Sequence, residues 1–505
     1  MVSSGLSALA FVSLGFQFQL VSATSAGQCV RNSCSLLTTS LPQNVFAAES
    51  DTYTYEAKNF WSATELLGPA CVYLPDTVEK VAAAIGLFVE HDCAFSVKSG
   101  GHSAIPGAAN IHDGVLMAME RLKTIDINLE EEYVIVGSGN LMGDIYSALD
   151  AYNLVAMIGR YEKVGLGVAL GAGFSYLVNK NGLAVDNILN FEVVLANATV
   201  VNANATSHPD LFKVLKGGNN NFGVVTSFKL RTEKTEGSIY GGVVYYPESS
   251  LDQVSDIIYD YHVRQAVRDV FTHALPQYGY NGTTNESVSF NLLVYNKAVD
   301  DLPPIMQGWL DIPYYENTLK NRKYYDLSVE VNDGYPDGQV QEQRVFSVYA
   351  NAQLYKDIWS HYRAWCQNYQ HIEGFYCLHV NMPITQRAIQ EGIQKGGNIL
   401  GLEDAEGVLG TIYFGVTFQY LKDANEVLPA HNEFVKSMEA LADSRGLLYR
   451  YIMLTYSGYN QAVLESYGQD NLQKMWEVQA AYDPDNVFQR LVPGGQKLPK
   501  QVCLA

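Results

Sequence analysis

Two glycine-rich segments hold the residues whose types and spacing are best suited to chemistry. The first follows a predicted strand over residues 95–98 and reads Ser99-Gly100-Gly101-His102-Ser103, continuing to Gly107 and Asn110. The second runs from Val164 to Gly173. Glycines directly after a strand let backbone N–H groups approach a phosphate closely, because no Cβ intervenes. Neither segment has the spacing of a Rossmann fingerprint or a P-loop, and each alone is more typical of a structural turn.

Other kinds of chemistry find no support in the chain. The seven cysteines form no Cys-x-x-Cys pair and the ten histidines form no His-Glu-x-x-His, so the sequence predicts no metal site. The 53 acidic and 33 basic residues leave a net charge of −20, which disfavours binding to nucleic acid or anionic membranes. With 48% apolar and 17% charged residues, the 505-residue chain is long enough for two or three folded units.

Short predicted strands alternate with predicted helices from residue 72 to about residue 230. The clearest helix covers residues 77–91, and a second covers residues 144–152. Strands are predicted over residues 95–98, 115–119, 134–137 and 222–230, with a hairpin over residues 191–196 and 199–202. Mixed elements with glycine-rich connections predict an α+β domain.

The pattern changes after about residue 236. Long aromatic β-rich runs cover residues 239–246, 287–295, 375–381 and 410–420, with amphipathic stretches between them at residues 249–262 and 353–369. This alternation predicts a second domain, a large antiparallel sheet with helices on one face. A last helix is predicted over residues 470–481, ending before Pro484.

The first thirty residues carry no charged side chain, and residues 6–20 are largely apolar. They predict a secretory signal peptide over residues 1–23, followed by an N-terminal arm over residues 24–66. The alternative, a membrane anchor, is disfavoured because glutamines interrupt the apolar run. Four Asn-x-Ser/Thr sequons fit a secreted glycoprotein that is free of the membrane after signal cleavage: Asn197, Asn204, Asn281 and Asn285.

Taken together and in order, three segments resemble the berberine-bridge-enzyme-like family of FAD-linked oxidases, of the vanillyl-alcohol-oxidase type. They are residues 97–103, residues 159–167 and residues 215–226 (Leu-Lys-Gly-Gly-Asn-Asn-Asn-Phe-Gly-Val-Val-Thr). Residues 466–468 and 482–488 resemble the closing segment of the family. The chain is most similar to fungal members associated with secondary metabolism. The resemblance implies an α+β fold with a PCMH-type FAD-binding domain over residues 67–236, an inserted substrate domain over 237–444, and a segment over 445–505 that returns to the first domain.

The resemblance also implies a set of cofactor-binding residues. His102 matches the histidine that bonds covalently to the 8α-methyl of FAD. The first loop would hold the pyrophosphate, the second would wrap the flavin, and four further positions would contact the adenosine and ribityl portions. The residues of the first loop are Gly100, Gly101, Ser103, Gly107 and Asn110. Those of the second loop are Gly165, Gly167, Gly171 and Gly173, and the four further positions are Asp186, Asn187, Gly223 and Val225.

The sequence departs from the family pattern in two places. Bicovalent members carry a cysteine where this chain has Tyr161, so no cysteinyl link to FAD is expected. The Tyr-x-Asn-Tyr motif of the family is matched by Tyr451-Ile452-Met453, but counting back from Ser466 without a gap places Thr455 at the Asn position. Tyr451 is therefore either a general base or a buried strand aromatic.

Two further residues are catalytic candidates. Residues 411–418 alternate, so that Tyr413 shares one face with Thr411 and Thr417, and one of the two faces must roof the flavin. Val164 occupies the position where oxidases of the family carry valine and poorly oxygen-reactive members carry leucine. The resemblance thus implies that Val164 controls the access of oxygen.

These observations predict a secreted oxidase that transfers a hydride from a small organic substrate to FAD, with O2 reduced to H2O2. The expected partners are the substrate and O2, and the expected state is a monomer or homodimer. An oligosaccharide oxidase of the same fold and a cyclase with a mainly structural flavin stay as alternatives, because fold does not fix function. Secretion and the resemblance together predict a disulfide between Cys34 and Cys93.

Overall fold

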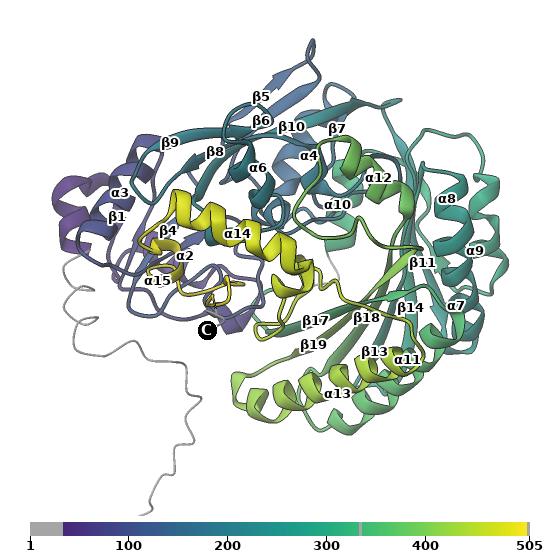
Figure 1. The fold of residues 1–505 in the computed structure, drawn as a ribbon. Coiled ribbons are helices and arrows are strands. Elements are labelled where there is room, and N and C mark those ends of the chain that lie inside the picture. Colours follow the sequence, from purple (N-terminus) through teal and green to yellow (C-terminus); the bar gives the residue numbers. More distant parts are fainter. Residues whose placement is uncertain (1–33, 333–335, 502–505) are drawn as a thin grey trace, which may run out of the picture.

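Three β-sheets organise the part of the chain that the computed structural model describes, residues 34–332 and 336–501 (Figure 1). The sheets have four, six and ten strands. The predicted signal peptide lies outside the described residues. Within them, no helix is long and apolar enough to cross a membrane.

The first sheet has the strand order β1-β2-β4-β3, in which β2, β4 and β3 are parallel. Helix α3 (Val78–Glu90) connects β2 to β3, and the Thr77 side chain caps its first turn by accepting the Lys80 N–H. The buried positions of α3, among them Val81, Ile85 and Phe88, recur at helical spacing and pack on the sheet. The strands are β1 (Val45–Phe46), β2 (Cys71–Tyr73), β3 (Phe95–Lys98) and β4 (Val115–Ala118), and helix α2 (Asp51–Lys58) precedes β2.

The second sheet is antiparallel and has the order β5-β6-β10-β8-β9, with β7 also paired to β10. The predicted hairpin is present as β8 and β9, joined through Leu195–Thr199. The strands are β5 (Ile125–Asn128), β6 (Tyr133–Gly137), β7 (Leu154–Ala156), β8 (Ile188–Val194), β9 (Val200–Asn204) and β10 (Val224–Lys234). The helices of this region are α4 (Met142–Asp150), α5 (Val178–Asn181) and α6 (Pro209–Leu215).

The third sheet begins at residue 239 and is built from long antiparallel strands, with β13-β18-β19-β17 at its centre. These four strands are β13 (Gln277–Asn281), β18 (Tyr376–Ile384), β19 (Leu409–Phe418) and β17 (Val340–Tyr349). The others are β11 (Ile239–Pro247), β12 (Thr272–Leu275), β14 (Glu286–Tyr295), β15 (Glu316–Asn317), β16 (Lys320–Arg322) and β20 (Leu448–Tyr449).

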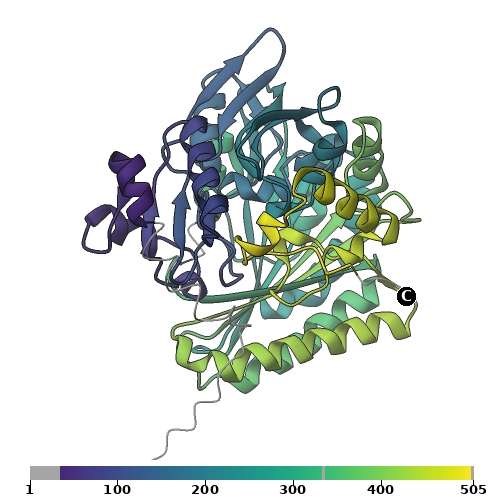
Figure 2. The same ribbon diagram turned by 60° about the vertical axis from the view of Figure 1, so that its left-hand side comes forward.

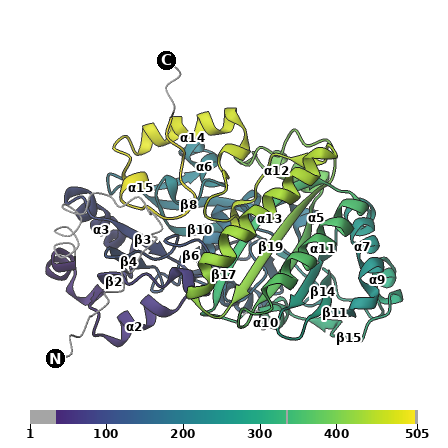
Figure 3. The same ribbon diagram turned by 90° about the horizontal axis from the view of Figure 1, so that it is seen from below.

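Long helices cover one face of the third sheet, and the other face looks toward the first domain (Figures 2 and 3). Helix α11 is capped by Asn351, whose side chain accepts the Leu354 N–H, and it buries a stripe that includes Ile358 and Tyr362. Its companions on this face are α7 (Leu251–Asp260) and α13 (Ala424–Ser444), while α11 itself spans Ala352–Cys366. Shorter helices in this part of the chain are α8 (Ala266–Arg268), α9 (Gln307–Asp311), α10 (Tyr324–Asn332) and α12 (Gln386–Gln394). The predicted α+β fold, with a large antiparallel sheet that helices cover on one face, is confirmed; this is the third sheet.

Residues 456–501 return to the first domain, where α14 (Gln469–Tyr482) packs against α6 (Figure 1). Tyr482 OH donates to Asp210 Oδ1 at 2.9 Å. Asn221 Nδ2 donates to the Gln496 carbonyl at 2.8 Å, which ties the tail to the loop before β10. The short helix α15 (Val487–Arg490) follows, and its Val487 and Phe488 join the core of the first sheet.

Two disulfides lie within the described residues. Cys34 pairs with Cys71, so the predicted Cys34–Cys93 bond is wrong. Cys71 opens β2, whereas Cys93 precedes β3, and β4 separates these two strands. Cys93 is itself disulfide-bonded.

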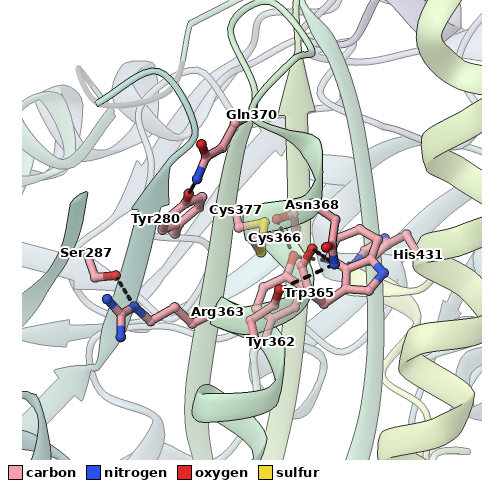
Figure 4. The surroundings of a disulfide bond; sticks show 12 residues. Tyr280, Ser287, Tyr362, Arg363, Trp365, Cys366, Asn368, Gln370, Cys377 and His431 are labelled. Carbon is pink, nitrogen blue, oxygen red and sulfur yellow. Dashed lines mark hydrogen bonds between the residues drawn. A yellow bond between two sulfur atoms is a disulfide. The ribbon is translucent and has the colours of Figure 1, made fainter. Parts of the chain in front are cut away.

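The second disulfide joins Cys366, at the end of α11, to Cys377 in β18 (Figure 4). Arg363 Nε donates to Ser287 Oγ at 2.9 Å, and Gln370 Nε2 donates to Tyr280 OH at 2.7 Å, on either side of this bond. The helix layer is thus fastened to the sheet at several points.

Candidate active site

A cavity of about 320 Å³ lies between the glycine-rich loops and the helix-free face of the third sheet. One side, here named the loop wall, consists of residues 99–103, 159–161, 164, 165, 167, 168, 170, 171, 219, 220 and 223–225. The opposite side, the sheet wall, consists of Leu275, Gln277, Gln343, Leu378, Val380, Met382 and Tyr413. Twelve of the predicted site residues line this cavity: Gly100, Gly101, His102, Ser103, Tyr161, Val164, Gly165, Gly167, Gly171, Gly223, Val225 and Tyr413.

The two glycine loops touch each other through their backbones. A Cβ on Gly100 would lie 2.5 Å from Gly165 N, and a Cβ on Gly165 would lie 2.2 Å from Gly100 N. Ser99 closes the junction, because its hydroxyl donates to the Ser138 carbonyl at 2.6 Å and accepts the Leu166 N–H at 3.1 Å. Glycine is therefore required at both positions by the protein itself, before any ligand is considered.

Gly167 behaves differently. Apart from its neighbours in the chain, no atom of the described residues lies within 4 Å of the Cβ that a side chain would add there, although the residue lines the cavity. Packing within the chain gives no reason for glycine at this point. The empty space beside its backbone is a cradle that a flat ligand can fill.

His102 projects from the first loop and is half-buried. The Trp61 ring stacks on its imidazole, with ring centroids 4.5 Å apart and planes 7° from parallel. The backbone N–H of Trp61 donates to the Gly101 carbonyl at 3.1 Å, which fixes the tryptophan to the same loop. The surrounding protein lowers the pKa of His102 to about 4, mainly through the loss of water around the ring. At neutral pH the imidazole is uncharged and can act as a nucleophile.

Gly107 and Asn110, predicted to bind the cofactor, do not line the cavity. Glu65 instead organises their part of the loop, since its carboxylate accepts the N–H groups of Gly107 and Ala109 at 3.3 and 3.1 Å. Asn110 Nδ2 donates to the Glu65 carbonyl at 2.7 Å. Burial raises the pKa of Glu65 to about 8. Gly107 and Asn110 thus stabilise the shape of the first loop without lining the cavity.

Gly173, Asp186 and Asn187 also lie outside the cavity lining. The Gly173 carbonyl accepts the Ala184 N–H at 3.0 Å. Asp186 accepts the Leu183 N–H at 3.0 Å and a bond from Asn398 Nδ2 at 2.8 Å. Asn187 Nδ2 donates to the Leu183 carbonyl at 2.9 Å. These residues brace the second loop against the segment that follows α12.

The sheet wall is built by strand alternation. Leu378, Val380 and Met382 are alternate residues of β18, and Tyr413 of β19 lies directly opposite Val380 in the register. Ile412 and Phe414 point to the other face and belong to the core under α11 and α13. The face of β19 that carries Tyr413 is therefore the one that roofs the cavity.

Tyr451 does not reach the cavity. It is fully buried, its ring stacks on Tyr467, and its hydroxyl has no hydrogen-bond partner among the described residues. Burial raises the pKa of Tyr451 well above its ordinary value. Thr455 does line the cavity and donates to the Gly171 carbonyl at 2.9 Å, as the count without a gap placed it.

Two residues that the sequence analysis did not single out complete the polar part of the cavity. Tyr456 follows Thr455, and its ring meets Tyr413 edge-on, with centroids 5.6 Å apart. Arg160, which precedes Tyr161, donates from Nη2 to Tyr456 OH at 2.8 Å. The count back from Ser466 that places Thr455 also places Tyr456 at the last tyrosine of the family motif, so a signal for Tyr456 existed.

Comparisons with known proteins agree with this geometry. A family model described as "FAD binding domain" matches residues 69–204. The chain is 31% identical to the FAD-dependent monooxygenase prx3 of Penicillium roqueforti, over 98% of this chain and 99% of that protein. It is 30% identical to the FAD-dependent monooxygenase tpcD of Cochliobolus heterostrophus, over 88% of this chain and 87% of that protein. The chain belongs to the berberine-bridge-enzyme-like FAD-linked oxidoreductases.

A solved structure shows the same fold. The berberine-bridge-enzyme-like protein 1 of Physcomitrella patens superposes with a TM-score of 0.76 at 18% identity, and the match covers 94% of this chain and 99% of that one. As a member of this family the protein is an FAD-dependent oxidoreductase, and its loop wall fits FAD. The open cradle at Gly167 is the feature that a bound flavin explains, because packing among the described residues gives no reason for glycine there.

In the described residues no group of three or more His, Cys, Asp or Glu side chains is placed to hold a metal ion. FAD, when bound, supplies the acceptor for a hydride. The chain supplies the cradle, the histidine beside it and the aromatic and polar side chains on the opposite wall.

Proposed function

We propose that the protein is an oxidase that removes a hydride from a small, largely apolar organic substrate, with FAD bound covalently through its 8α-methyl to His102 and O2 reduced to H2O2. The observation that carries the proposal is the cavity itself. It brings the histidine loop, the glycine cradle and the tyrosines of the sheet wall and C-terminal segment into one space. Tyr161 stands where a cysteinyl link would need a thiol, so one link is expected.

Tyr456 is the group we assign to take the proton that accompanies hydride loss. Tyr456 lines the cavity, and its oxygen accepts a hydrogen bond from the Arg160 guanidinium, which holds that oxygen in place. The oxygen can take the substrate proton while the phenol passes its own O–H proton to solvent, so that the transfer leaves Tyr456 uncharged. Tyr413 has a different part. Burial raises the pKa of Tyr413, so its hydroxyl keeps its proton and can donate a hydrogen bond to the substrate.

The covalent link is tested by acid precipitation of the purified yellow protein. We expect the flavin to stay with the wild-type precipitate, and His102→Ala to release it into the supernatant. His112→Ala is the matched control, because the His112 side chain is exposed on the surface and should leave the link intact. Free flavin from the wild-type protein would overturn the covalent assignment.

The names of the relatives favour a second candidate, a monooxygenase, in which one oxygen atom enters the product. The two functions differ in stoichiometry. An oxidase releases one H2O2 for each O2 consumed and needs no added reductant. Incorporation of label from 18O2 into the product, with little peroxide released, would instead establish the monooxygenase.

We also propose that the protein passes through the secretory pathway and acts on metabolites made by the producing cell, in line with the resemblance to enzymes of secondary metabolism. Two disulfides in the described residues and exposed sequon asparagines at 197, 281 and 285 support the secretory route. A mass decrease after glycosidase treatment of the natural protein, together with an N-terminus near residue 24, is the expected result.

A further inference from the structure

We infer that the substrate carries a carboxylate on an otherwise apolar frame, and that Arg160 binds this carboxylate. The inference deepens the proposed function and rests on it in one respect, since it takes the cavity to be the substrate site. It concerns the chemical class of the ligand, which neither the fold nor the family membership specifies.

Arg160 is a buried cation whose contacts include no acid. Its side chain is 3% exposed. Its partners within the described residues are Tyr456 OH at 2.8 Å, His273 Nε2 at 3.3 Å and Met382 Sδ at 3.5 Å, and its guanidinium lies 5.4 Å from the Phe174 ring centroid. None of these groups carries a negative charge, and a guanidinium in a protein is always charged.

Among the described residues, three of the four other buried lysines and arginines are paired with carboxylates; the fourth, Lys216, instead lies over the Phe212 ring. Lys98 Nζ lies 2.9 Å from Glu56 Oε2, and Arg344 Nε lies 2.7 Å from Glu342 Oε1. Arg322 forms an ion pair with Glu330. The protein has a net charge of −20, so acidic residues are plentiful and their scarcity does not explain why none lies beside Arg160. Because an unpaired buried charge is costly, the missing counter-charge is expected from a ligand.

The cavity itself provides no such counter-charge. Among the described residues that line it there is no aspartate, glutamate or lysine, and Arg160 is its one arginine. His273 does not compete for the anion, because burial and then the neighbouring Arg160 hold the pKa of His273 well below its ordinary range. The positive charge of Arg160 is thus left uncompensated within the cavity.

The direction of Arg160 points to the substrate rather than to the FAD phosphates. Its backbone belongs to the loop wall, but its guanidinium reaches across to His273 in β12, Met382 in β18 and Tyr456 in the C-terminal segment. The loop that resembles a pyrophosphate site, residues 100–110, supplies none of these contacts. The planar guanidinium has five donors, and its contacts leave donors available for a carboxylate.

The neighbouring side chains define the rest of the ligand. Leu275, Leu378 and Val380 give the sheet wall an apolar surface near Arg160. Such a surface accommodates a ring or alkyl frame, and the few polar groups fix its orientation. A neutral sugar fits this combination poorly, because most of its hydroxyl groups would meet apolar walls.

The test compares two probes of the same shape, 2-naphthoate and its neutral isostere 2-naphthamide, binding to the holoenzyme. Binding is followed by calorimetry and by the change in flavin absorbance. We expect 2-naphthoate to bind at least tenfold more tightly than 2-naphthamide. Arg160→Gln should abolish this preference while retaining the affinity for 2-naphthamide, and Arg160→Lys should keep part of it. Arg387→Gln on exposed helix α12 is the matched control and should keep it all.

Equal affinity of the wild-type protein for the two probes would overturn the inference. A loss of affinity for both probes in Arg160→Gln would also overturn it, and would assign Arg160 to the cofactor or the fold. The wild-type comparison holds even if Arg160→Gln fails to bind flavin. Because these are equilibrium measurements, they need no turnover. A failed peroxide assay would therefore overturn the proposed function and leave the binding result standing.

Discussion

On the loop wall of the cavity the chain contributes mainly backbone, whereas on the sheet wall it contributes side chains. The loop wall depends on two backbones that approach too closely for any Cβ, as at Gly100 and Gly165. The sheet wall depends on alternate residues of β18 and β19, among them Val380 and Tyr413. A backbone wall can hold a constant cofactor, while a side-chain wall can change its chemistry one residue at a time without altering the fold.

The strongest test of this difference between the two walls adds one methyl group to the loop wall. Gly100→Ala places a Cβ 2.5 Å from Gly165 N, and we expect it to destabilise the flavin-free protein by about 2 kcal/mol and to abolish flavin loading. Thermal unfolding and the flavin-to-protein ratio measure the two effects.

Gly167→Ala is the control for that change. Its Cβ would meet no atom of the described residues beyond its chain neighbours, so the flavin-free protein should keep its stability to within about 0.5 kcal/mol, while flavin content falls. If the two variants unfold alike, the distinction between a glycine required by packing and one required by a ligand is wrong.

Tyr456, in the C-terminal segment, and Tyr413, on the sheet wall, are expected to differ in their effects. Tyr456→Phe should lower the rate of substrate-driven flavin reduction by about 100-fold, the usual contribution of a general base. Tyr413→Phe should instead raise KM about threefold, since it removes a single hydrogen bond to the substrate. Anaerobic stopped-flow reduction gives both values. Equal effects of the two changes on the rate would contradict the separate parts assigned to these tyrosines.

Val164 belongs to the loop wall, and its effect on the reaction with O2 is a further test of what this wall does. It lines the cavity beside Gly165, and Val164→Leu adds one methylene to a packed wall. We expect reoxidation by O2 to slow about tenfold, a barrier increase of about 1.4 kcal/mol, with flavin loading and reduction unchanged. Slowing of both half-reactions, or of neither, would show that Val164 only packs the loop.

The smallest effect on catalysis is expected outside both walls. Tyr451→Phe should leave turnover unchanged and should stabilise the protein by about 1 kcal/mol, because the buried hydroxyl of Tyr451 has no partner among the described residues. Turnover with substrate and denaturant unfolding test the two parts. A large fall in turnover would restore Tyr451 as a general base.

The sequence was a better guide to the loop wall than to the sheet wall. Glycines that are required by a close backbone approach appear as a motif, so Gly100, Gly165 and His102 could be placed in advance. The sheet wall could not, because alternation separates two faces of β19 without saying which one meets the cavity. Arg160 was missed because nothing local distinguishes a buried cation without an acid partner from a surface arginine.

The Cys34–Cys93 prediction failed for a similar reason. Neither secretion nor a resemblance of sequence gives the order of strands in a sheet, and β4 lies between β2, which begins at Cys71, and β3, which follows Cys93. Asp186 and Asn187 were placed in the right region, but their side chains brace the second loop instead of facing the cavity. Local patterns thus predicted the elements, while contacts between distant segments decided which side chains reach the site.

The return of the C-terminal segment has a consequence for the order of events during synthesis. Tyr456, Phe488 and Val492 all line the cavity, and Asn220 Nδ2 on the loop wall donates to the Gly494 carbonyl at 3.0 Å. The loops of the first domain are synthesised hundreds of residues before these partners, and Phe488 and Val492 also belong to the core of the first sheet. The cavity wall is therefore complete only once residues 456–494 have left the ribosome, so final enclosure of the flavin must follow the synthesis of this segment.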